Sequence, residues 1–213
     1  MPSGDASIAA AILAGGLARR MNGANKAQLR IGAERIVERQ LRLLRTIADP
    51  VFVVSNRSED FSELGVEVVP DVIAGAGPLG GIYTALLASP RERTLVVGCD
   101  LPFLTLPLLE RLAAPSTAEL VIPRSSRGYE PLCATWAAGC ADVLRRRIEA
   151  GTLKTALAVE ELRVEEIGAE LVASCDPDGL LFVNINTPHD YERAQRLARA
   201  ESKASRDRIM DVS

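Results

Sequence analysis

The sequence predicts a single α/β domain with a mostly parallel sheet and helices on both faces. Seven short apolar runs have the length of strands, and they are continuously apolar, as expected of strands covered on both sides. Helix-type patterns lie between these runs, and such alternation favours parallel pairing. The chain of 213 residues can bury a sizeable core, and it contains no repeat and no low-complexity linker.

The predicted strands lie at residues 8–13, 51–55, 66–69, 94–98, 120–122, 132–136 and 181–185. The predicted helices lie at residues 34–48, 79–88, 107–114, 137–150 and from 188 onward. The last helix has a complete start signal, with Thr187 as N-cap, Pro188 in the first turn and Asp190 three residues after the cap. We expect the domain to cover residues 1–200 and residues 201–213 to form a frayed polar tail.

The composition argues against several classes of function. The 25 Lys and Arg residues nearly balance the 28 Asp and Glu residues, and aromatic residues make up 4% of the chain, so a nucleic-acid partner is not expected. The single histidine argues against His-based metal cages and Ser-His-Asp catalysis. No signal peptide or membrane span is predicted, and we expect a cytoplasmic protein without a membrane partner.

The four cysteines contain no CxxC pair, so a disulfide scaffold is not expected. We interpret Cys99 as a small buried residue and not as a nucleophile. The roles of Cys133, Cys140 and Cys175 stay open.

A loop rich in glycine and cations follows the first predicted strand. It runs from Leu13 to Lys26 with the sequence LAGGLARRMNGANK. Gly15 and Gly16 can present successive N–H groups to an anion, and Arg20 and Lys26 can add bonds to phosphate oxygens. The loop is neither a Walker A loop, because no glycine directly precedes the lysine, nor a GxGxxG motif. A phosphate-binding loop is therefore favoured over a solvated surface turn.

Two aspartates follow predicted strands at the edge where parallel sheets bind ligands. Asp71 could accept hydrogen bonds from the N1–H and amino group of guanine or from a ribose hydroxyl, and a structural turn is the alternative. Asp100 is a candidate metal ligand, because Mg²⁺ takes one or two carboxylates together with phosphate oxygens and water. A turn or N-cap role is the alternative for Asp100.

The segment from Gly75 to Gly80 formally satisfies GxGxxG. A dinucleotide site is disfavoured, because the glycines do not directly follow a strand and lie outside the first βα unit. We expect Gly77 to open a helix, and Gly80 and Gly81 to allow close approach of another chain segment or a ligand.

Asn184 and Asn186 alternate with Ile185, so a strand would place both amides on one side. They could bind a pterin edge or a phosphate there, and capping of the last helix is the alternative. Arg124 and Arg127 are assigned to a loop over the same site, and Trp136 is expected in the core.

Four motifs, in this order, resemble the nucleotidyltransferases that make sugar nucleotides and dinucleotide cofactors. They are Leu-Ala-Gly-Gly-x-x-x-Arg-Met-x-Gly-x-x-Lys from Leu13, Gly-Pro-Leu-x-Gly-Ile from Gly77, Cys-Asp-x-Pro-Phe from Cys99 and Asn-x-Asn-Thr-Pro from Asn184. The second and fourth resemble the branch that guanylylates the molybdenum cofactor, within the MobA-like NTP transferase family. The resemblance covers about residues 8–197. Asn22 departs from it where many members have glycine, which matters little because asparagine tolerates left-handed backbone.

The resemblance implies a Rossmann-like nucleotidyltransferase fold and transfer of GMP from GTP to the terminal phosphate of molybdopterin, with release of pyrophosphate. It implies catalysis by Arg20, Lys26 and Asp100, with Mg²⁺ (or Mn²⁺) on Asp100. The implied GTP-binding residues are Leu13, Ala14, Gly15, Gly16, Lys26, Asp71, Gly77 and Asp100, and the implied acceptor-binding residues are Asn184, Asn186, Gly80 and Gly81. Cofactor-delivery proteins would be partners.

Three alternatives remain open at this point. The first is a sister transferase that uses CTP or makes another cofactor or sugar nucleotide. The second is a non-catalytic nucleotide-binding regulator, and the third is a dinucleotide-dependent oxidoreductase. The physical chemistry of the sequence does not choose between GTP and CTP.

Overall fold

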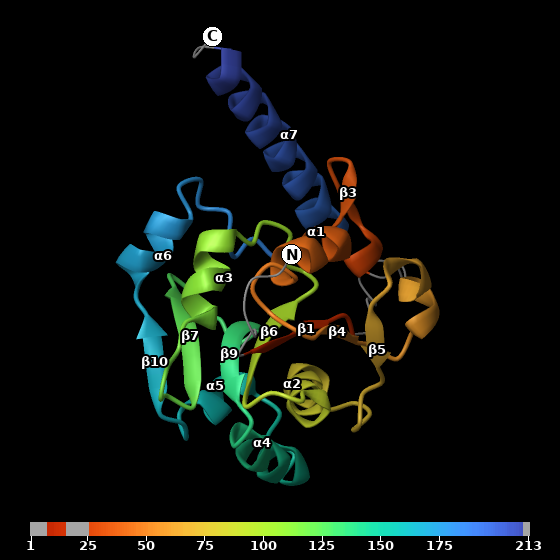
Figure 1. Cartoon of the computed structure of the whole chain (residues 1–213), viewed down its shortest axis with the longest axis vertical. Helices are drawn as coiled ribbons and strands as arrows, with labels where there is room; N and C mark the ends of the chain where they lie inside the picture. Colours follow the sequence, from red (N-terminus) through yellow and green to blue (C-terminus); the bar gives the residue numbers. More distant parts are fainter. Residues whose placement is uncertain (1–7, 16–25, 211–213) are drawn as a thin grey trace.

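A central sheet organises the chain (Figure 1). The computed structural model describes residues 8–15 and 26–210, and only the backbone of residues 26 and 200–210. In this part of the chain, eight strands form one sheet in the order β10-β7-β9-β6-β1-β4-β5, with β8 paired to β7. The strands are β1 (Ala9–Leu13), β4 (Val51–Val54), β5 (Glu67–Val69), β6 (Arg93–Gly98), β7 (Leu120–Ser125), β8 (Gly128–Tyr129), β9 (Cys133–Ala137) and β10 (Val164–Ile167). Neighbours are parallel except where β9 pairs with β6 and β7, and where β8 pairs with β7.

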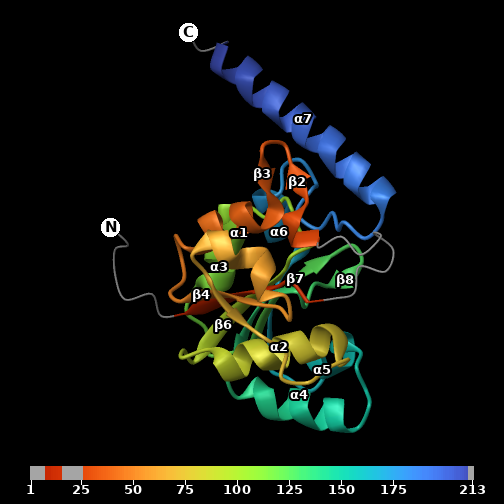
Figure 2. The ribbon, with the colours of Figure 1, turned by 90° about the vertical axis from the view of Figure 1, so that its right-hand side faces the viewer.

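Helices cover both faces of the sheet (Figure 2). One face carries α1 (Ile36–Leu44), α3 (Leu106–Ala113) and α6 (Ala169–Cys175). The other carries α2 (Gly77–Ala88), α4 (Cys140–Glu149) and α5 (Thr155–Val159). The small hairpin of β2 (Arg30–Ile31) and β3 (Glu34–Arg35) and the turns η2 (Lys26–Gln28) and η3 (Ser58–Leu64) complete the body, and α7 (Pro188–Met210) projects from it.

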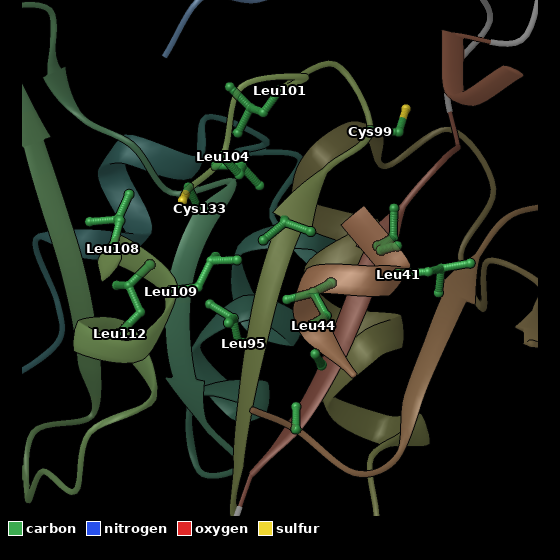
Figure 3. Packing of buried hydrophobic residues seen from close by; sticks show 14 of the residues in the cluster. Leu41, Leu44, Leu95, Cys99, Leu101, Leu104, Leu108, Leu109, Leu112 and Cys133 are labelled. Atoms are coloured by element: carbon green, nitrogen blue, oxygen red, sulfur yellow. The ribbon is translucent and has the colours of Figure 1, made fainter. Parts of the chain in front are cut away.

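The core consists of two layers because successive strand residues point to opposite faces. In β1, Ala10 and Ile12 belong to the cluster under α1, α3 and α6, whereas Ala9, Ala11 and Leu13 belong to the cluster under α2, α4 and α5. Figure 3 shows the first cluster, with side chains of α1 and α3 packed on those of the sheet. The predicted fold class is thereby confirmed.

Two smaller expectations about the core are also confirmed. Trp136 is fully buried in the second cluster. All four cysteines are buried and none forms a disulfide, and burial raises the pKa of the Cys140 thiol to about 11. A thiol with so high a pKa is protonated at neutral pH, so Cys140 is not a nucleophile.

The prediction of a strand at residues 181–185 is wrong. This segment forms a turn followed by irregular backbone, because its amides bond to partners outside any sheet. The carboxylate of Asp176 accepts the N–H groups of Leu180 and Leu181, and the N–H of Ile185 donates to the carbonyl of Asp100. The apolar run is buried all the same, since Leu180 and Ile185 pack in a third cluster at the base of α7.

The predicted start of the last helix is confirmed. The amide of Asp190 donates to Thr187 Oγ1, and the Asp190 carboxylate accepts the N–H groups of Asn186 and Thr187. The backbone of α7 stays helical to Met210, ten residues beyond the predicted end of the domain at residue 200, and that boundary stays a prediction. Within the described residues, none of the helices combines the length and the apolar character needed to cross a membrane.

Candidate active site

Four parallel strands end level with one another at the carboxyl edge of the sheet. Gly98 of β6, Leu13 of β1, Val54 of β4 and Val69 of β5 are register partners in successive pairs. The residues two positions further along, Asp100, Gly15, Asn56 and Asp71, therefore follow the ends of four neighbouring strands. We call these four residues the carboxyl-edge row. Loop residues at this edge are free of the sheet's ladder of hydrogen bonds, which is why ligands of parallel sheets bind there.

Asp71 lies against Gly15 and is held by Asn56. The Asn56 amide donates to Asp71 Oδ2 over 3.0 Å, and the Asp71 N–H donates to Asn56 Oδ1 over 2.9 Å. A Cβ added to Gly15 would lie 3.1 Å from Asp71 Oδ2. Glycine at this position thus lets the carboxylate lie directly over the loop backbone. Partial burial raises the pKa of Asp71, and the hydrogen bond from Asn56 opposes this shift.

The raised pKa of Asp71 predicts a pH-dependent stability effect. The folded state binds the proton more tightly than the unfolded chain, so this contribution to stability is present at low pH and is lost as pH rises through the folded pKa. Asp71→Asn removes the buried charge. Its stability relative to the wild type, measured as the difference in the free energy of unfolding, is therefore expected to be higher at about pH 7 than at about pH 3.

Urea unfolding at the two pH values measures this difference. Asp142→Asn, which alters an exposed aspartate of α4, is the matched control and is expected to show a smaller change between the two conditions. An equal or opposite change in Asp71→Asn would contradict the assigned effect of burial.

The turn that carries Asp100 is bonded both to the end of β1 and to a segment far along the chain. Its carboxylate folds back over Gly98, because a Cβ added to Gly98 would lie 2.7 Å from Asp100 Oδ1. The neighbouring Cys99 N–H donates to the Leu13 carbonyl, and the Asp100 carbonyl accepts the Ile185 N–H over 3.0 Å. The Cys99–Asp100 pair is therefore bonded to the end of β1 through Cys99 and to the segment that carries Asn184 and Asn186 through Asp100.

The glycines of α2 have packing reasons of their own. Gly77 has a φ of 59° at the start of the helix, in the left-handed region that favours glycine. A Cβ on Gly80 would lie 2.6 Å from Ala76 Cβ, and one on Gly81 would lie 3.1 Å from the Leu13 side chain. The close approach expected at Gly80 and Gly81 is thus made by the chain itself. Neither glycine lines the pocket described next.

A pocket of about 620 Å³ lies along the segment around Ile185, whose N–H bonds to the Asp100 carbonyl, although Asp100 itself does not line the pocket. Asn184 and Asn186 both line it, although their segment is not a strand. The other polar lining residues are Arg124, Ser125, Ser126, Arg127, Asp176, Asp190 and Arg193. Among the described residues, no donor reaches the buried Oδ1 of Asn184, and a ligand with an N–H group would relieve that cost.

The pocket is lined by charged side chains of both signs, most of which have partners within the protein. Asp176 and Asp190 each accept two backbone N–H groups, and the hydrogen bonds of Asp190, chiefly that with Thr187, lower the pKa of its carboxyl. Arg124 lies over the Tyr129 ring and pairs with Glu166 over 3.3 Å. Arg127 donates to the Phe182 carbonyl over 2.6 Å and pairs with Glu130 over 3.2 Å. The β7–β8 hairpin is thus tied to the segment that carries the two asparagines.

Several predicted site residues fall outside the description. Gly16 and Arg20 lie outside the described residues, and so does the side chain of Lys26. Of the remaining ones, Leu13, Ala14, Gly15, Asp71 and Asp100 lie at or beside the row, and the asparagine pair lies in the adjoining pocket. Sequence reasoning missed Asn56, Arg193 and Gln40. A polar residue in the buried stripe of a helix was the available signal for Gln40.

Comparison with known proteins agrees with this geometry. Residues 10–166 match the model of the MobA-like NTP transferase domain. A probable molybdenum cofactor guanylyltransferase of Pelotomaculum thermopropionicum is 34% identical over 88% of this chain and 91% of its own length. The molybdenum cofactor guanylyltransferase of Desulfosudis oleivorans is 28% identical over 91% of this chain and 97% of its own.

The solved structures include a similar protein. Molybdopterin-guanine dinucleotide biosynthesis protein A from Archaeoglobus fulgidus superposes with a TM-score of 0.77 at 28% identity, over 90% of this chain and 99% of that one. The family model covers most of the chain, and a relative more than 30% identical matches it over nearly its whole length. The chain therefore belongs to the MobA-like NTP transferase family.

Proposed function

We propose that the protein is a molybdenum cofactor guanylyltransferase. It transfers GMP from GTP to the terminal phosphate of molybdopterin or molybdenum cofactor, and pyrophosphate leaves. The names of its relatives support this choice of substrates. The observation that carries the proposal is that Asp100, a member of the carboxyl-edge row, bonds through its carbonyl to Ile185, which lies between the pocket residues Asn184 and Asn186.

The nucleotide is assigned to the row. Backbone of Leu13, Ala14 and Gly15 would meet base and phosphates, and Gly77 would lie at the nearby start of α2. Asp71 can accept hydrogen bonds from guanine or ribose, since Asn56 presents its carboxylate over Gly15. Gly16, Arg20 and Lys26, which follow Gly15 in the sequence, would supply amides and cations for the phosphates.

A magnesium ion fits the donors at Asp100. One half-buried carboxylate, held at the strand end, is a hard oxygen ligand of the kind Mg²⁺ prefers, and phosphate oxygens and water would supply the other ligands. Mn²⁺ prefers the same oxygen donors and could replace it. When bound, the metal would supply positive charge to the α-phosphate and the leaving pyrophosphate.

The acceptor is assigned to the pocket. A volume of about 620 Å³ suits a small organic ligand. Asn184 and Asn186 would bind the pterin edge, and Arg124, Arg127 and Arg193 would favour its phosphate. Gly80 and Gly81, which were also assigned to this ligand, would contribute indirectly, because they allow α2 to pack closely against Ala76 and Leu13.

The residues catalyse by alignment and charge neutralisation. An oxygen of the acceptor phosphate forms a bond to the α-phosphorus of GTP, and the bond to the bridging oxygen of the β-phosphate breaks. The electron pair of that bond leaves with pyrophosphate. No general base is needed, because a phosphate monoester is already ionised near neutral pH. This agrees with the exposed position of His189, the one histidine of the chain.

An assay of pyrophosphate release tests the proposal. Each of the four common NTPs is supplied with and without molybdopterin. Release is expected with GTP and molybdopterin together and not with the other combinations. Release with CTP would identify a sister transferase, and GTP binding without release would identify a regulator. Either result would overturn the proposal.

We further propose that the enzyme works in the cytoplasm and that it exchanges its cofactor with delivery proteins. The absence of a membrane-spanning helix among the described residues is compatible with the first statement. Co-purification of the protein with molybdenum-cofactor carriers, dependent on the acceptor, would support the second.

A further inference from the structure

Helix α1 carries a polar side chain on its buried face. Gln40 is 1% exposed, and the other buried residues of this helix are Ile36, Val37, Leu41 and Leu44, all apolar. Leu41 and Leu44, labelled in Figure 3, belong to the same core cluster as Cys99 and Leu101 of the turn that follows β6. Gln40 thus lies at the boundary between the core and the turn that carries Asp100.

Both N–H groups of the Gln40 amide are used on this turn. Nε2 donates to the carbonyl of Gly98 over 2.8 Å and to the carbonyl of Leu101 over 3.0 Å. The two acceptors flank Cys99 and Asp100 in the chain. Because both neighbours can only accept, the amide must direct its nitrogen toward them, and its orientation is chemically determined.

This arrangement leaves Gln40 Oε1 without a donor. The atom is buried, and no described residue donates to it. A buried acceptor without a partner is unfavourable, and a methionine or leucine would fill the same space without that cost. Packing alone therefore does not explain a glutamine at this position. Its two hydrogen bonds to the turn of residues 98–101 do explain it.

The turn leaves little freedom to the Asp100 carboxylate. Gly98 accepts a further hydrogen bond from the Leu101 N–H over 3.3 Å, and the Asp100 carbonyl accepts the Ile185 N–H. Gln40 ties this turn to α1, which packs on the sheet through Leu41 and Leu44. Loss of the amide would release the carbonyls on both sides of Asp100 and allow its carboxylate to shift.

We propose that Gln40 is a positioning residue, which holds the turn of residues 98–101 so that Asp100 meets the metal-bound triphosphate. This inference rests on the proposed function. Gln40 acts through the backbone and does not touch the substrates. Its effect should therefore appear in the part of GTP affinity that depends on metal, and in kcat more than in the KM for the acceptor.

Gln40→Met tests the proposal, because methionine keeps the length of the side chain and removes both donors. Thr135→Val is the matched control. Thr135 is fully buried in β9 and donates to the Leu112 carbonyl over 2.7 Å, so its loss also removes a buried hydrogen bond, but away from the row. Thermal unfolding compares the stability of the two variants.

Calorimetry measures GTP affinity with Mg²⁺ and with EDTA, and the ratio of the two affinities is the readout. Gln40→Met is expected to lower this ratio about tenfold, since small misplacements of a site group are costly. Its affinity in EDTA should match the wild type, and Thr135→Val should keep the wild-type ratio. If Gln40→Met keeps the ratio, or if Thr135→Val lowers it equally, the role of Gln40 is overturned while the proposed function stands. If the wild type shows neither a metal-dependent ratio nor turnover, the proposed function itself fails.

Discussion

Asp100→Asn is expected to lower turnover about a thousandfold, which corresponds to about 4 kcal/mol of transition-state stabilisation. Asparagine has nearly the same shape as aspartate but no negative charge, so it would bind the metal ion at the phosphates much more weakly. The half-buried position at the end of β6 and the backbone bond to Ile185 should remain, because both depend on the main chain. Pyrophosphate release from GTP and molybdopterin at saturating Mg²⁺ measures the effect.

Asp142→Asn on α4 is the matched control for this variant and should keep wild-type turnover. EDTA is expected to bring the wild type down to the level of Asp100→Asn and to change that variant little. Near wild-type turnover of Asp100→Asn with Mg²⁺ would remove this residue from the site.

Gly98→Ala is expected to lower turnover about a hundredfold with little loss of stability. The added methyl carbon would lie 2.7 Å from Asp100 Oδ1, a distance that real Cβ atoms avoid, so the carboxylate must move. Gly98 does not have a positive φ, and alanine is therefore compatible with its backbone. Steady-state kinetics together with thermal unfolding separate the catalytic effect from a folding defect.

Gly139→Ala at the start of α4 controls for the substitution itself. A Cβ there would contact no atom within 4 Å, and its φ is −60°. This control should behave as the wild type in both measurements. If Gly98→Ala also behaves as the wild type, the position of the Asp100 carboxylate is not critical for the reaction.

Much of the fold could be predicted because strands covered on both faces have a distinct apolar pattern. Strands β1, β4, β5, β6, β7 and β9 were all predicted. Strand β10 was missed because its two glutamates interrupt the apolar run, which is tolerated at the edge of the sheet. Residues 181–185, in contrast to β10, have the apolar pattern of a buried strand but do not form one. They are apolar and buried, but the Asp176 carboxylate and the Asp100 carbonyl take their N–H groups.

The candidate site could be predicted only in part. The rule that ligands bind at the carboxyl ends of parallel strands was enough to select Gly15, Asp71 and Asp100. It could not find Asn56 or Gln40, because their roles depend on which strands are neighbours and on the side of α1 that faces the turn. The two amides of the predicted acceptor segment do line one pocket, although the strand from which this was expected does not exist, and their role in binding the acceptor stays a prediction.

The central claim is that Asp100 binds the metal of a triphosphate lying along the carboxyl-edge row. A crystal structure with Mn²⁺ and a non-hydrolysable GTP analogue tests it most directly, because Mn²⁺ can be located by anomalous scattering. We expect one Mn²⁺ bonded to an Asp100 carboxylate oxygen and to phosphate oxygens, with the base or ribose beside Asp71. A metal-bound analogue that occupies another part of the molecule, with Asp100 left uncoordinated, would contradict it.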